Sequence, residues 1–131
     1  MNFRHTTAAL ALAMLATALQ AAPSTNPYAG DPDAARLGEE LFGRNCQLCH
    51  NSRGKGGKAP SLVRGAWAPG GANSDAFMFM TISNGRPNTQ MGGWASSLTE
   101  DEIWRVITFL RAESARVREA DRKRVDEEPP W

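Results

Sequence analysis

The chain has 131 residues, of which 41% are hydrophobic and 22% are charged, and its formal net charge at pH 7 is +1. A chain of this length predicts one small domain with a modest apolar core. The near balance of acidic and basic residues provides no strong basic field, which argues against nucleic acid or an anionic membrane as a partner.

The N-terminus has the pattern of a secretory signal peptide. Arg4 and His5 precede an Ala/Leu-rich run over residues 8–22, with small residues suited to cleavage after Ala18, Ala21 or Ala22. The run is shorter than the ~20 residues that span a bilayer, so an uncleaved anchor is the less favoured alternative. We therefore predict a signal peptide over residues 1–22, export to the bacterial periplasm and no stable membrane insertion. Residues 23–131 are expected to form a single domain.

The first predicted helix covers residues 32–45. Asp31 stands directly before Pro32, a pairing typical of a capped helix with proline in its first turn. Leu41 and Phe42 belong to its apolar side.

Residues 46–50 read Cys-Gln-Leu-Cys-His, which is the attachment sequence of a c-type haem. In a helix, residues three apart share a face, so the thiols of Cys46 and Cys49 can reach the two vinyl groups along one haem edge. His50 follows directly, and its imidazole can bind the iron as the proximal ligand. The sequence therefore predicts one haem c, attached through Cys46 and Cys49.

Other cysteine sites fit this chain less well. Its two cysteines both lie in the motif, and two cysteines with one histidine fall short of the four ligands of a structural zinc site. A thioredoxin-like pair is expected beside a βαβ pattern, which the sequence lacks. A simple disulfide or redox pair remains an alternative to haem attachment.

Residues 51–71 are rich in Gly, Pro, Ser and Lys and predict a loop along one side of the haem, with Leu62, Val63 and Trp67 as apolar contacts. A short helix is predicted over residues 74–83, capped by Asn73 or Ser74. Its residues are nearly all apolar, so we expect it to be well buried.

Met91 is the candidate for the second iron ligand. It lies in a turn-rich loop over residues 84–94, and His5 would leave with the signal peptide, so His50 has no second histidine as a partner. Methionine opposite histidine is the pairing of electron-transfer haems. Met78 and Met80 are alternative ligands, but methionines on an apolar helix usually fill the core. Lys55 and Lys58 could bind iron only after losing a proton, which is unfavourable at neutral pH.

The last predicted helix begins after Thr99, because Thr99 and Glu102 form a capping box. An apolar stripe follows as far as Leu110. From about residue 112 the chain continues as a charged C-terminal extension, which we expect to project into solvent until Pro129-Pro130 ends any helix.

From about Ala35 to Arg111 the chain resembles a class I c-type cytochrome, of the monohaem, bacterial periplasmic kind. Besides the haem motif, Gly38 and Phe42 resemble the residues at which the family's first and last helices cross, here on Phe109 or Trp104. The resemblance implies an all-α cytochrome c fold, a small helical domain wrapped round one covalently bound haem.

The resemblance also implies roles for two further residues. The carbonyl of Pro60 is expected to accept a hydrogen bond from His50. Arg86 is expected either to pair with a haem propionate or to be an ordinary surface arginine. Gly92 stands where many members of the family have proline after the ligand methionine, which predicts a more pliable loop.

His50 and Met91 together imply iron that cycles between Fe(II) and Fe(III) in a monomeric electron carrier rather than an enzyme. The partners implied are redox proteins, namely a periplasmic quinoprotein dehydrogenase, the cytochrome bc1 complex or a terminal oxidase. Two other functions remain open, a haem subunit of a larger oxidoreductase and an open-site haem enzyme or gas sensor.

Overall fold

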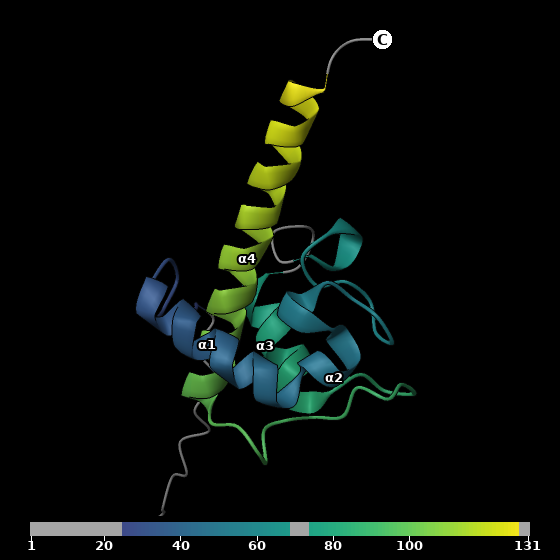
Figure 1. Ribbon diagram of the computed structural model, residues 1–131. Helices are drawn as coiled ribbons and strands as arrows, with labels where there is room; N and C mark the ends of the chain where they lie inside the picture. The colour runs from purple at the N-terminus through teal and green to yellow at the C-terminus, as the bar shows by residue number, and fades with distance from the viewer. Residues whose placement is uncertain (1–24, 69–73, 129–131) are drawn as a thin grey trace, which may run out of the picture.

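The computed structural model describes residues 25–68 and 74–128, so the predicted signal peptide, Asn73 and Pro129-Pro130 lie outside the described part. All regular structure in these two ranges is helical, which confirms the all-α prediction (Figure 1). The elements are α1 (Pro32–Asn45), α2 (Gln47–His50), η1 (Ser52–Gly54), η2 (Gly65–Trp67), α3 (Asp75–Asn84) and α4 (Glu100–Glu127). Among the described residues, no helix has the length and apolar character needed to cross a membrane.

Helices α1 and α4 cross in close contact at Gly38. A Cβ atom on Gly38 would lie 1.9 Å from the backbone oxygen of Arg105, so only glycine fits this crossing. The ring of Phe42 lies beside that of Phe109, with centroids 5.4 Å apart. The predicted crossing on Phe109 is thus confirmed, whereas Trp104 stacks on Phe79 of α3 at 4.4 Å.

Side-chain caps fix where the three longer helices begin. The carboxylate of Asp31 accepts hydrogen bonds from the backbone N–H groups of Asp33 and Ala34. Ser74 caps α3 by accepting from Phe77 N–H at 3.1 Å, and Thr99 forms the predicted capping box with Glu102. Each cap satisfies N–H groups that the first helical turn leaves unpaired.

The prediction that the helix at residues 74–83 is well buried was wrong for part of it. Phe79 is buried against Trp104, but Phe77 and Met80 are 48% and 51% exposed. Helix α3 packs on α4 along one side only, so an almost wholly apolar sequence still leaves side chains outside the protein core.

The prediction that α4 projects into solvent beyond Arg111 also needs correction. Glu113, Ser114 and Val117 are all buried, and Arg64 binds Asp121 through two hydrogen bonds of 2.8 and 3.0 Å. The segment that follows the haem motif therefore covers the first turns of the extension. Only the last turns of α4 stand clear of the other helices (Figure 1).

Candidate functional site

The two cysteines and the histidine of the motif lie in one helical turn. Cys46 joins α1 to α2, and its carbonyl accepts hydrogen bonds from Cys49 N–H at 3.3 Å and His50 N–H at 3.0 Å. This turn brings both thiols to the same side of the helix. Cys46 is partly buried and Cys49 is exposed, and both are free thiols.

Burial and, to a smaller extent, the neighbouring Cys49 together raise the pKa of the Cys46 thiol to about 11. Before haem is attached, the Cys46 thiol is therefore protonated at neutral pH. Cysteine acts as a nucleophile in the thiolate form, so this thiol is poorly reactive in the folded chain without a partner that activates it.

The loop after the motif folds back onto it through backbone hydrogen bonds. Gly56 N–H donates to the His50 carbonyl at 2.8 Å, and Ala59 N–H donates to the Cys49 carbonyl at 3.0 Å. Gly56 has a φ of +90°, and a Cβ atom there would lie 2.7 Å from the nitrogen of Ser61. The reversal therefore depends on glycine at this position.

This reversal brings the Pro60 carbonyl to the imidazole of His50. The carbonyl oxygen lies 3.2 Å from Nδ1 of the ring. A carbonyl can only accept a hydrogen bond, so in the neutral ring the contact favours the tautomer with the proton on Nδ1 and the lone pair on Nε2. The contact thus orients the ring and leaves Nε2 able to bind a metal.

Met91 ends a tight turn that begins at Arg86. Arg86 N–H donates to the Met91 carbonyl at 2.8 Å. Thr89 Oγ1 donates to the Arg86 carbonyl at 2.8 Å and accepts from Met91 N–H at 3.2 Å. Met91 is partly buried. Trp94 N–H donates to the Ile82 carbonyl at 2.9 Å, which ties the end of this loop to the last turn of α3.

Arg86 and Trp67 form a cation–π pair that the sequence did not predict. The guanidinium carbon of Arg86 lies 4.1 Å from the centroid of the Trp67 ring. Trp67 is 41% exposed, whereas Val63 is buried in the core and Leu62 packs against it. Two of the three predicted apolar residues in this loop, Leu62 and Val63, thus contact the core, whereas Trp67 packs against a charged side chain.

A charge cluster around Glu113 was also missed. The side chain of Glu113 is 1% exposed and is bound by Arg53 at 2.6 Å and Arg116 at 2.7 Å. Arg53 also pairs with Glu39 of α1. Arg53 thereby joins the loop after the haem motif to both α1 and α4.

Burial tends to raise the pKa of Glu113, but the hydrogen bonds and charges of Arg116 and Arg53 outweigh it and lower the pKa to about 2. The only sequence signal for this site is its register, because Glu113 continues the apolar spacing of Val106, Leu110 and Val117 along α4.

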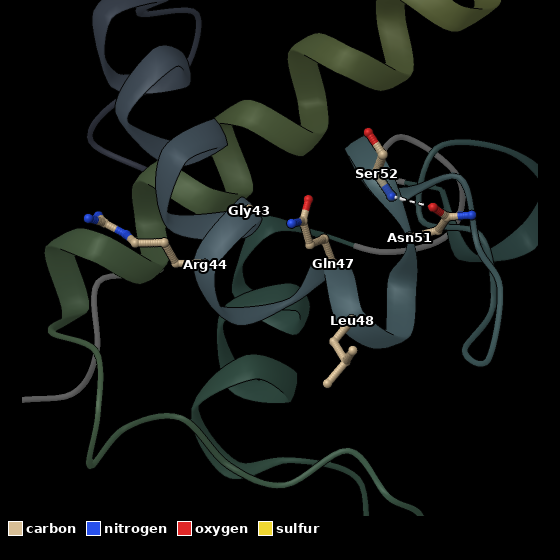
Figure 2. A pocket seen from close by; sticks show the side chains of 6 residues that line it. All are labelled: Gly43, Arg44, Gln47, Leu48, Asn51 and Ser52. Atoms are coloured by element: carbon tan, nitrogen blue, oxygen red, sulfur yellow. Dashed lines mark hydrogen bonds between the residues drawn. The ribbon is translucent and has the colours of Figure 1, made fainter.

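A surface hollow lies beside the motif, on the side away from the thiols. It is lined by residues from the end of α1, from α2 and from the start of η1, as Figure 2 shows; they are Gly43, Arg44, Gln47, Leu48, Asn51 and Ser52. At about 100° per residue, Gln47 and Leu48 lie on the side of α2 opposite to Cys46 and Cys49. This hollow is therefore not the place to which the cysteines point.

A family model described as cytochrome c oxidase, cbb3-type, subunit III matches residues 33–110. The chain belongs to the c-type cytochrome family. It is 34% identical to cytochrome c55X of Stutzerimonas stutzeri over 112 residues, which cover 82% of this chain and 90% of that protein.

This cytochrome is also 34% identical to cytochrome c-L of Methylorubrum extorquens over 86 residues, which are 66% of the chain but only 43% of the relative. The chain thus spans less than half the length of that relative. Among solved structures it is similar to cytochrome cL of Methylophaga aminisulfidivorans, with a TM-score of 0.58 and 27% identity over 79% of this chain and 71% of that one.

Covalently bound haem c is the cofactor of this family, and the cytochrome shares it. The residues present fit the group. Two free thiols lie one helical turn apart, and the adjacent imidazole has its Nδ1 proton bound and its Nε2 lone pair available.

Proposed function

We propose that this cytochrome is a periplasmic monohaem electron carrier whose iron is ligated by His50 and Met91. The observation that carries the proposal is the 3.2 Å contact between Nδ1 of His50 and the Pro60 carbonyl, directly beside the two free thiols. A metal-binding histidine normally donates its other ring N–H to such an acceptor, which fixes the ring and raises its basicity.

Each residue of the site has a distinct part in the proposal. Cys46 and Cys49 hold the porphyrin by thioether bonds, and His50 binds the iron through Nε2. Pro60 keeps the Nδ1 proton in place. Met91 would supply the second iron ligand from the turn at residues 86–91. Bound haem c supplies a one-electron Fe(II)/Fe(III) couple, and a methionine ligand favours the reduced iron and raises the potential.

With His50 and Met91 both bound, the iron would have no open position, which would favour electron transfer over an open-site haem enzyme or gas sensor. The chain has two histidines, of which His5 lies in the predicted signal peptide, so no second histidine of the exported protein could assist cleavage of an O–O bond.

The proposed partners are redox proteins of the periplasm, namely a quinoprotein dehydrogenase, the cytochrome bc1 complex or a terminal oxidase. Export rests on the predicted signal peptide over residues 1–22, and residues 23–131 form the proposed cytochrome domain. The near-neutral charge favours weak docking of a monomer through contacts around the haem edge, as in transient redox complexes. The family's oxidase description favours a second possibility, a haem subunit of a larger oxidoreductase.

Replacing Met91 with alanine should abolish the weak far-red absorption band of methionine bound to ferric haem, because the thioether is removed and the iron loses its second ligand. The measurement is the absorption spectrum of the purified protein, oxidised and reduced, with the haem shown to be covalently bound by its resistance to acid–acetone extraction. The variant should also bind carbon monoxide when reduced.

Met80→Ala is the matched control, because Met80 is a half-exposed methionine on α3 and should leave the spectrum unchanged. A high-spin spectrum in the unaltered protein, with no change in Met91→Ala, would exclude Met91 as the ligand. An open-site function would then be the better explanation.

A further inference from the structure

The Met91 turn and the loop after the haem motif are far apart in sequence but touch through one pair of side chains. The guanidinium of Arg86 lies over the ring of Trp67 at 4.1 Å. Trp67 belongs to η2, which follows the segment that carries Pro60 and Val63. The pair therefore connects the segment proposed to hold the proximal ligand to the turn proposed to hold the distal one.

Arg86 is well placed to control Met91 through this contact. Its backbone N–H binds the Met91 carbonyl at 2.8 Å, and its carbonyl accepts from Thr89, which in turn binds Met91 N–H. Four residues separate Arg86 from Met91, and hydrogen bonds close the turn between them. Fixing the Arg86 side chain thus fixes one end of a turn whose other end is Met91.

Pro87 restricts the backbone on the Arg86 side of this turn, whereas glycines lie on both flanks of it. Gly85 has a φ of +75°, and Gly92 and Gly93 follow Met91 directly, with no proline beside the methionine. Glycine adds conformational freedom, so the position of Met91 depends on contacts rather than on the backbone. Among the described residues, the contact of Arg86 with Trp67 joins this turn to the loop after the haem motif. The hydrogen bonds of residues 86–91, by contrast, join residues of the turn to one another.

We propose that the stack of Arg86 on Trp67 is a clamp that positions Met91 against the iron, so that Arg86 and Trp67 are positioning residues for the axial ligand. The proposal rests on the proposed function, in which Met91 is that ligand. It predicts that loss of the stack makes Met91 easier to displace without removing it.

The test measures the affinity of imidazole for the oxidised holoprotein, because imidazole must displace Met91 to bind the iron. Trp67→Ala should raise this affinity about threefold to tenfold, as expected for loss of a cation–π contact of ordinary strength. Trp67→Phe keeps a ring face and should restore affinity most of the way to that of the unaltered protein. Arg86→Lys keeps the charge and the backbone hydrogen bond but loses the planar stack, so it should behave like Trp67→Ala.

Tyr28→Ala is the matched control, since it removes a second cation–π pair, with Arg105 at 4.9 Å, that lies between the N-terminal segment and α4. Its imidazole affinity should equal that of the unaltered protein. Because Tyr28→Ala also loses a packed aromatic, an equal rise in this control would assign the effect to general loosening and overturn the proposal. If Trp67→Ala does not fold, Arg86→Lys decides the question alone.

The spectrum of the unaltered protein distinguishes failure of the clamp from failure of the proposed Met91 ligation. If the far-red methionine band is absent, Met91 ligation fails and the clamp fails with it. If the band is present but Trp67→Ala and Arg86→Lys bind imidazole as the unaltered protein does, only the clamp is overturned.

Discussion

Replacing Gly38 with alanine should destabilise this cytochrome by about 2 kcal/mol, although alanine is the better helix former. A Cβ atom at Gly38 would lie 1.9 Å from the Arg105 oxygen and 2.5 Å from its carbonyl carbon. These are backbone atoms that cannot rotate away, so α1 and α4 must separate. Such overpacking typically costs about 1–3 kcal/mol and sometimes more, which exceeds the gain in helix propensity of about 1 kcal/mol.

Gly43→Ala provides a control in the same helix with the opposite sign. A Cβ atom there would meet its nearest neighbour, Oε1 of Gln47, at 3.9 Å, which is ordinary contact. This variant should stabilise the protein by about 0.5–1 kcal/mol. Urea unfolding of the two holoproteins measures both changes, and equal midpoints would contradict the close crossing of α1 and α4.

Replacing Glu113 with glutamine should cost about 2–3 kcal/mol of unfolding free energy. The side chain of Glu113 is 1% exposed and binds both Arg53 and Arg116, so the substitution leaves guanidinium groups without their carboxylate. The side chains of Arg53 and Arg116 are 36% and 58% exposed, so water solvates the charges left behind and the cost is that of lost hydrogen bonds to a charged group. Glu119→Gln is the control on the same helix, because Glu119 pairs at the surface with Arg122 and Lys123. It should change stability by less than about 1 kcal/mol.

The same carboxylate predicts a pH dependence whose sign follows from its pKa. The pKa of Glu113 in the folded protein is lowered to about 2 from an ordinary value of 4.5. Its contribution to stability is therefore complete above pH 4.5 and declines as the pH falls from 4.5 towards 2. Unfolding free energies of the unaltered protein and Glu113→Gln should converge over this range. A difference that stays constant down to pH 2 would contradict the lowered pKa.

Local signals in the sequence were enough to predict the helix starts and the haem motif. Asp31, Ser74 and Thr99 each lie within three residues of the N–H groups that they cap, so the relevant chemistry is contained in a short stretch of chain. The two thiols and His50 are likewise neighbours in sequence. Features of this kind depend on the helix alone and little on the rest of the fold.

The Arg53–Glu113 pair could not be predicted in the same way, since its partners are 60 residues apart. Arg53 lies in a basic loop and Glu113 in a helical segment with charges of both signs, and charged segments of either kind usually face solvent. Their pairing follows from the crossing of α1 and α4, which brings the loop after the motif against the C-terminal helix. The half-exposed side chains of α3 have a similar origin, because composition does not tell how many sides of a helix are covered.

The anchoring of the Arg53 loop by α4 also affects the order in which the molecule is assembled. Synthesis proceeds from the N-terminus, so Cys46, Cys49 and His50 are made well before Glu113. Contacts between distant residues form only once the later segment exists. A chain that ends before Glu113 therefore lacks the contact that holds the Arg53 loop against α4. The loop after the motif acquires its packed position only when α4 is complete.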